Sequence, residues 1–111
     1  MSTDAGQSPP VRRLVIYRPK PGSYAFLANV LRRHGPALRA AGLITSEGVR
    51  LYRATDDPGE GDPEPYLIET FKWRDQRSMD EAHNIPEIVA IYRDMDPHLQ
   101  SMTMTTLDGL T

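Results

Sequence analysis

The chain contains no cysteine, which excludes disulfide bonds, thiolate metal ligands and a cysteine nucleophile. No stretch comes near the ~20 consecutive apolar residues that a membrane-spanning helix needs. The first ten residues lack the apolar segment of a secretory signal peptide. We therefore expect a cytoplasmic protein that has no membrane partner.

A large excess of charge of one sign is also missing, because the formal net charge is only −2. Basic residues predominate before residue 54 and acidic residues after it. A nucleic-acid-binding protein needs a concentrated basic face. We interpret the distribution as attraction between the two halves, within one chain or between two copies, and expect no nucleic-acid partner.

The 111 residues, 39% of them hydrophobic, match one domain of ordinary composition. Residues 1–10 are mostly small, polar or proline, which predicts a disordered N-terminal tail. Residues 11–111 then form a single domain.

The hydrophobic pattern alternates between strand and helix periodicity along that domain. Two features predict breaks in the helices: Gly35-Pro36, and the pair Asn84 and Pro86. The expected elements, in chain order, are a strand at 11–18 buried on both faces, a helix from Tyr24 to about 41, a strand at 49–54, a strand at 66–74, a helix from Asp75 or Ser78 to Met95, and a strand at 102–107.

This β-α-β-β-α-β order predicts an α+β, ferredoxin-like sandwich, with a four-stranded antiparallel sheet and two helices on one face. The other sheet face, which carries Tyr66, Ile68 and Thr70, is then left uncovered. An open, partly apolar sheet face needs a partner. We expect a homodimer in which two such sheets pack face to face.

The strand at 66–74 carries the most informative pattern. Its alternation places Leu67, Glu69, Phe71 and Trp73 on one face. A charged carboxylate is too costly to bury without a partner, so Glu69 indicates a polar cavity or an exposed exception. His83 follows on the next helix, which predicts a small-molecule pocket between these two elements.

Within this pocket, His83 or Glu69 is the candidate general base, and His34 is a third candidate catalytic residue. Trp73, Phe71, Tyr17 and Tyr92 are the candidate substrate-binding residues. Structural alternatives stay open: Trp73 as a core or interface aromatic, Glu69 as the partner of an arginine, and His34 as a core histidine on the apolar stripe of its helix. No metal site is expected, because the three histidines lack i, i+4 spacing.

The run E-x-F-x-W-x-D followed by D-E-A-H resembles a strand-to-helix segment of antibiotic biosynthesis monooxygenase-like proteins, in the dimeric α+β barrel superfamily. The turn R-P-K-P-G is similar to the strand-to-helix turn of the same family. The resemblance implies a dimeric barrel and a monooxygenase that acts without a cofactor on a phenolic or polyketide-like substrate. Trp73 matches the family's pocket tryptophan, but Glu69 stands where an asparagine is expected.

Two alternatives remain within this superfamily. The run from Arg32 to Gly42 is similar to the first helix of L-rhamnose mutarotases, although the paired tryptophans of a later helix are absent. This favours a mutarotase- or isomerase-like enzyme as one alternative, and a non-catalytic ligand-binding or structural dimer as the other. Haem degradation ranks low, because the strand L-V-I-Y-R has no asparagine.

Overall fold

A computed structural model describes residues 9–56 and 64–111. The expected disordered tail at 1–10 therefore lies mostly outside the described residues, and its Pro9 and Pro10 are exposed. The acidic, proline- and glycine-rich segment 56–65 predicts a surface loop between antiparallel strands, and its residues 57–63 also lie outside the described residues.

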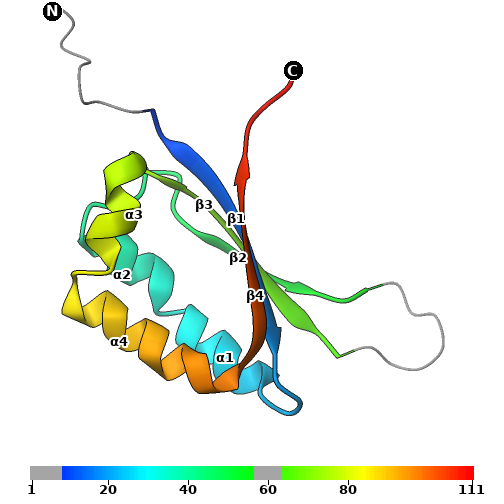
Figure 1. Cartoon of the computed structure of the whole chain (residues 1–111). Helices are drawn as coiled ribbons and strands as arrows, with labels where there is room; N and C mark the ends of the chain where they lie inside the picture. The colour runs from blue at the N-terminus through cyan, green and yellow to red at the C-terminus, as the bar shows by residue number, and fades with distance from the viewer. Residues whose placement is uncertain (1–8, 57–63) are drawn as a thin grey trace, which may run out of the picture.

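The element order is β-α-α-β-β-α-α-β, because each expected helix is divided into two (Figure 1). The elements are β1 (Val11–Pro19), α1 (Tyr24–Leu31), α2 (His34–Ala40), β2 (Arg50–Ala54), β3 (Tyr66–Trp73), α3 (Gln76–Ala82), α4 (Pro86–Met95), the short 3₁₀ helix η1 (Asp96–His98) and β4 (Leu99–Leu107).

The four strands form one antiparallel sheet in the order β2-β3-β1-β4. All the helices lie on the same side of this sheet (Figure 1). The predicted ferredoxin-like, two-layer architecture is confirmed. β4 begins at Leu99, earlier than the expected residue 102, because the end of β1 extends the pairing to Pro19.

Both helix divisions follow from proline chemistry. Pro36 has no N–H to donate to the carbonyl of Arg32, so α1 ends at Leu31 and α2 restarts with the proline in its first turn. Pro86 likewise opens α4, where a missing N–H costs nothing. These divisions place His34 at the first position of α2 and His83 at the end of α3.

The core lies between the sheet and the helices, and its largest fully buried side chains include Phe71, Leu27 and Ile88. β1 is buried on one face only: Val15 and Tyr17 are buried, whereas Leu14 and Ile16 on the other face are half-buried. The expectation of a strand buried on both faces is therefore wrong for a single chain, because no described element covers the outer face of the sheet.

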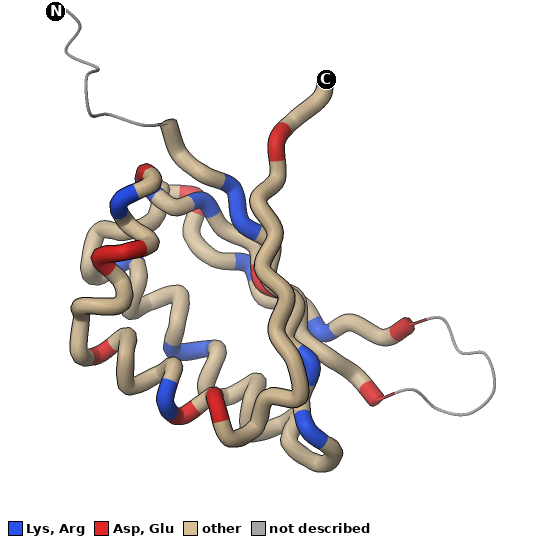
Figure 2. Tube along the Cα trace, in the orientation of Figure 1, with Lys and Arg blue, Asp and Glu red and all other residues tan. Residues whose placement is uncertain are grey.

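Charged residues of both signs are interspersed along the helices and strands (Figure 2). Ion pairs join the basic first half to the acidic second half at Arg18–Asp56 and Arg33–Asp94. Others form within one half, as at Arg12–Glu47. No described helix is long and apolar enough to span a membrane.

The start of α3 depends on a side-chain cap. The carboxylate of Asp75 accepts hydrogen bonds from the Ser78 backbone N–H and hydroxyl, both at 3.0 Å. We predict that Asp75→Ala lowers the melting temperature by roughly 4 °C or more, because two donors at the helix start lose their acceptor. Thermal unfolding followed by circular dichroism measures this, with Asp80→Ala in the same helix as the control that leaves the cap intact. Equal melting temperatures for the two variants would contradict a role for the cap.

Candidate functional site

The inward face of β3 carries the predicted residues. Leu67, Glu69, Phe71 and Trp73 are 2%, 0%, 2% and 6% exposed, whereas the residues between them are half-buried. The predicted face assignment is therefore confirmed. It points a glutamate side chain into the interior, between the sheet and the helices.

The carboxylate of Glu69 is fully buried, and both of its oxygens are hydrogen-bonded. Oε1 accepts from the hydroxyl of Tyr17 at 2.7 Å, and Oε2 lies 2.9 Å from Nδ1 of His34. These partners come from β1 and α2, so one carboxylate connects the sheet to the helix layer. An isolated buried carboxylate is strongly unfavourable, and these two bonds are what make its burial possible.

His34 continues the hydrogen-bonded chain toward Tyr92 on α4. Its Nε2 lies 3.1 Å from the Tyr92 hydroxyl, and its ring packs edge-on against Phe71 and Tyr92. A glutamate carboxylate can only accept, so Nδ1 of His34 donates to it, and in the tautomer that carries its proton on Nδ1 the Nε2 atom can accept from the Tyr92 hydroxyl. The chain thus runs from Glu69 through His34 to a phenol.

The hydroxyls of Tyr17 and Tyr92, the two tyrosines of this hydrogen-bonded network, stay protonated at neutral pH. Burial, and then the charge of Glu69, raises the pKa of Tyr17 well above its usual value. The same two causes raise the pKa of Tyr92 to about 12. The two phenols therefore act as neutral hydrogen-bond donors, and neither is a phenolate nucleophile.

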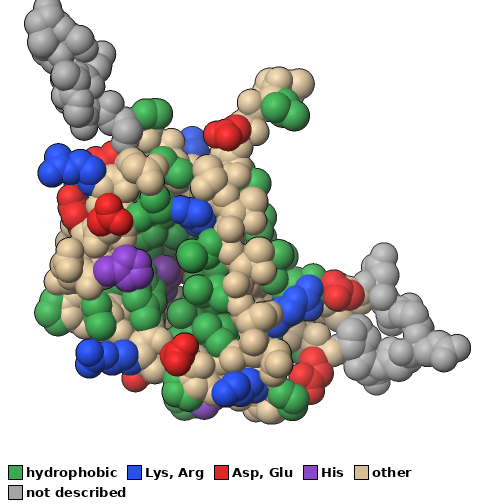
Figure 3. All heavy atoms as spheres, in the orientation of Figure 1, with side chains coloured by type: hydrophobic (Ala, Val, Ile, Leu, Met, Phe, Trp, Pro, Cys, Tyr) green, Lys and Arg blue, Asp and Glu red, His purple; other side chains and the backbone are tan. Residues whose placement is uncertain are grey.

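A cavity of about 650 Å³ lies between the helices and the sheet, within the size range of small-molecule sites. Figure 3 shows it as a hollow where hydrophobic and histidine side chains gather, between the helices and β4. Its apolar walls include Phe71, Trp73, Met79, Met95, Met102 and Met104. Met102 and Met104 are 43% and 60% exposed, so the β4 side of the cavity is open.

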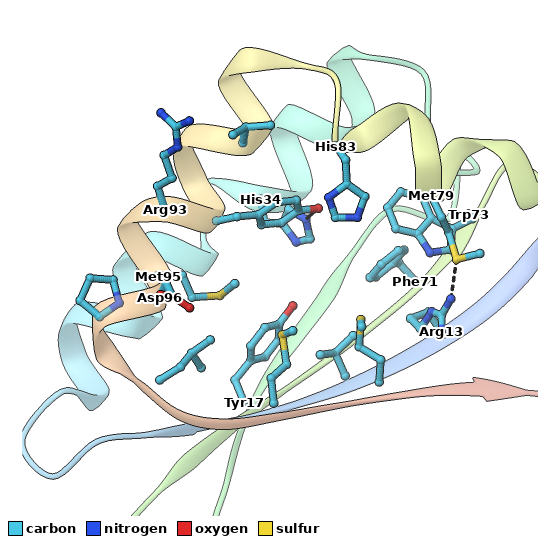
Figure 4. A pocket seen from close by; sticks show the side chains of 17 residues that line it. Arg13, Tyr17, His34, Phe71, Trp73, Met79, His83, Arg93, Met95 and Asp96 are labelled. Atoms are coloured by element: carbon cyan, nitrogen blue, oxygen red, sulfur yellow. Dashed lines mark hydrogen bonds between the residues drawn. The ribbon is translucent and has the colours of Figure 1, made fainter.

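Most of the predicted site residues meet at this cavity. His34, His83, Tyr17, Tyr92, Phe71 and Trp73 all line it (Figure 4). The side chain of His83 is exposed, and its ring centroid lies 5.7 Å from that of Tyr92. Glu69 does not line the cavity: it sits behind Tyr17 and His34 and acts on the cavity only through them.

Several residues that line the cavity were not predicted from the sequence, including Arg13, Met79 and the two methionines of β4. A signal existed for Arg13, because it shares the strand parity of Val15 and Tyr17 on β1. The methionines carried no comparable signal, because only the packing of α3 and β4 brings them to the cavity. Among the described residues, no group of three or more His, Asp or Glu gathers in a way that could hold a metal ion.

No known family model matches the chain, and no curated protein matches it. Solved structures match it over nearly its whole length. An antibiotic biosynthesis monooxygenase superimposes with a TM-score of 0.70 at 16% identity, covering 91% of this chain and 99% of its own.

Two further structures bear on the comparison. SnoaB, a cofactor-independent oxygenase from Streptomyces nogalater, solved in a mutant form, matches with a TM-score of 0.69 at 12% identity, covering 94% of this chain and 96% of its own. A dimeric ferredoxin-like protein of unknown function from Bacteroides fragilis NCTC 9343 matches with a TM-score of 0.66 at 14% identity. The match covers 90% of this chain and 96% of that protein's chain. The resemblance seen in the sequence is thereby confirmed as a shared fold.

The bond from Tyr17 to Glu69 generates a stability prediction. Tyr17→Phe keeps the ring but leaves one oxygen of a fully buried carboxylate without its donor. We expect the free energy of unfolding to fall by about 1–3 kcal/mol, measured by urea denaturation. The matched control is Tyr24→Phe on α1, which lies outside the Glu69 network and away from the outer sheet face, and the change should stay within about 0.5 kcal/mol. Equal effects of the two variants would show that the buried bond contributes nothing specific.

Proposed function

We propose that the protein binds a small phenolic or enolisable molecule in its cavity and oxygenates it with dioxygen, without a cofactor. The observation that carries this proposal is the hydrogen-bonded chain Glu69–His34–Tyr92, which ends at an apolar cavity. Such a chain moves a proton, and the apolar walls of the cavity limit the contact of water with a reactive carbanion. The shared fold of SnoaB and of an antibiotic biosynthesis monooxygenase supports the same chemistry.

In this proposal, Tyr92 and His34 carry the proton. The substrate O–H donates to the Tyr92 oxygen while Tyr92 passes its own proton to Nε2 of His34, which lies 3.1 Å away. Tyr92 remains neutral throughout, as its pKa of about 12 requires. Glu69 is a positioning residue: it orients the imidazole through Nδ1 and stabilises the imidazolium that forms.

His83 is the second acid–base group of the proposal. Its exposed ring lies at the cavity beside Tyr92, where it can exchange a proton with solvent. Loss of the enol proton leaves an enolate, whose carbanion-like carbon bonds to one atom of dioxygen, and the His34 imidazolium returns its proton through Tyr92 to the peroxide that forms. Loss of water from that peroxide leaves a carbonyl, so a CH₂ group and O₂ give C=O and H₂O.

The alternatives differ in what they require of the cavity. A mutarotase binds a sugar, whose hydroxyls need many polar partners, whereas methionine and aromatic side chains dominate this lining. A non-catalytic binding protein needs the cavity but not the relay. The apolar lining therefore favours a phenolic ligand, and the relay favours catalysis. We also propose, from the sequence, that the protein is cytoplasmic.

Anthrone, whose enol form is a phenol, provides the test. We expect one O₂ consumed per anthraquinone formed, with no added flavin, haem or metal, as measured with an oxygen electrode and by absorbance. Tyr92→Phe should lower kcat by ~10²–10⁴-fold, because it breaks the relay, with little change in anthrone binding. His83→Ala should fold normally and also lose activity. Tyr24→Phe, outside the cavity lining, is the control that keeps full activity.

Two results would contradict parts of this proposal. Tight anthrone binding without oxygen uptake would show that the protein binds the ligand but does not oxygenate it. Full activity of Tyr92→Phe would remove the relay from the mechanism.

We also propose that the chain is a homodimer joined through the outer face of its sheet. That face carries apolar side chains that no described helix covers: the exposed Tyr52 and Leu107 and the half-buried Leu14, Ile16 and Ile68. The dimeric state of a protein with the same fold supports the formation of a dimer. Exposed apolar area of this kind favours a partner of the same shape.

Light scattering after size-exclusion chromatography should give a particle of twice the 12.5 kDa chain mass. Ile68→Arg places a charge at the centre of the face and should give monomers. Ala90→Arg, on the exposed side of α4, is the matched control that should stay dimeric. A wild-type particle of 12.5 kDa at micromolar concentration would exclude the dimer.

A further inference from the structure

Arg13 is a cation on the inward face of β1. Its neighbours on that face are the apolar Val11 and Val15, and Tyr17, which already donates a hydrogen bond to Glu69. The register pairs Val11 with Trp73, Arg13 with Phe71 and Val15 with Glu69, so Arg13 projects toward the helix layer and not toward the open face. Its side chain is half-buried and lines the cavity. A guanidinium in such a place needs hydrogen-bond acceptors.

The protein supplies Arg13 with a poor acceptor. Its Nη2 contacts the thioether sulfur of Met79 (Figure 4), and sulfur is a weak acceptor. Within the described residues, Arg13 forms no ion pair, whereas its neighbour Arg12 pairs with Glu47 at 2.9 Å. The cation on the cavity side of β1 is thus left without a carboxylate.

A second donor at the same end of the cavity is also unsatisfied. Trp73 is only 6% exposed, and its indole Nε1 is buried without a hydrogen-bond partner among the described residues. Trp73 lines the cavity next to Met79 and Arg13, as Figure 4 shows. A buried donor left unpaired is costly, and this cost is removed when a ligand supplies an acceptor.

The two ends of the cavity carry different charged side chains. Arg13 stands at one end with Trp73 and Met79, while Asp96 and Arg93 stand at the opposite end, beyond Tyr17 and His34 (Figure 4). Asp96 and Arg93 are both exposed to solvent and opposite in sign, so that end offers an anion no net attraction, whereas Arg13 is half-buried and has no carboxylate partner among the described residues. The Arg13 end is therefore where a negative group is best accommodated.

We propose that Arg13 and the indole N–H of Trp73 form a carboxylate subsite, so that the natural ligand is a phenolic acid. This inference rests on the proposed function, because it places the ligand hydroxyl at Tyr92 and its acid group at Arg13. A carboxylate displaces the flexible thioether of Met79, since a charge-assisted bond to arginine is stronger than a contact with sulfur.

The spacing of the two ends defines the shape of the ligand. Tyr17 belongs to the same hydrogen-bonded network as Tyr92 and lies four residues from Arg13 on β1, which is ~13 Å along the strand from Cα to Cα. A single ring with adjacent hydroxyl and carboxylate groups is too short to reach both ends. The cavity of about 650 Å³ instead suits two or three fused rings with the acid at the end opposite the hydroxyl.

Isothermal titration calorimetry of the full chain at neutral pH tests this with three probes: 6-hydroxy-2-naphthoic acid, the corresponding carboxamide, and 2-naphthol. The wild-type protein should bind the acid about 10–100-fold more tightly than the amide, as expected for hydrogen bonds to a charged group. Arg13→Gln should bring the acid-to-amide ratio to about 1 while changing 2-naphthol binding by less than about twofold, because the neutral probe does not use the charge.

Two further variants control for the overall charge and for folding. Arg93→Gln removes an equal charge from the other end of the cavity and should keep the preference for the acid. Arg13→Lys retains the charge without the planar fork and should keep part of the preference. The thermal unfolding of each variant shows whether the fold is retained.

The outcomes separate the subsite from the proposed function. If 2-naphthol binds but the acid has no advantage over the amide, the subsite is wrong and the phenol cavity stands. The subsite is also wrong if Arg13→Gln still prefers the acid over the amide. It is equally wrong if Arg93→Gln abolishes that preference as completely as Arg13→Gln does. If none of the probes binds, the phenol cavity itself is wrong and the subsite falls with it.

Discussion

The burial of the Glu69 carboxylate is the constraint on which the site depends. With no exposed surface of its own, this side chain needs donors from the protein, and it takes them from Tyr17 on β1 and His34 on α2. These bonds hold the helix layer in register with the centre of the sheet. They also orient His34 so that its second nitrogen meets Tyr92 at the cavity. The same charge that is costly to bury therefore arranges the polar edge of the site.

The cavity follows from the way in which the helix layer is divided. A continuous helix packed along the sheet would fill the space between the layers with its own side chains. Prolines 36 and 86 instead separate each helix into two shorter ones, and the junctions carry His34 and His83. Flexible methionines from α3, α4 and β4 line the space that remains, and thioether side chains adapt readily to a ligand. The helix breaks thus serve the site as well as the fold.

The two faces of the sheet have different tasks. The inner face carries the buried core, the carboxylate network and the cavity, and the outer face carries a half-buried apolar surface. The open β4 side of the cavity lies next to this outer face, because Met102 and Met104 alternate with residues that point outward. In the proposed dimer and the proposed ligand complex, assembly and ligand binding therefore use the same edge strand.

Much of the architecture could be predicted from local sequence patterns. The alternation along residues 66–74 predicted which side of β3 is buried, and the prolines predicted the helix breaks, because both signals act over a few residues. The chemistry of their side chains marked His34, His83, Tyr17 and Tyr92 as candidates, and all four line the cavity. Only the tertiary structure decided that Glu69 is a buried support and not a cavity base. It also joined His34 to a carboxylate 35 residues away, and left Arg13 beside a thioether. Hydrogen-bond partners at such separations depend on how the strands and helices pack, and no local periodicity encodes that packing.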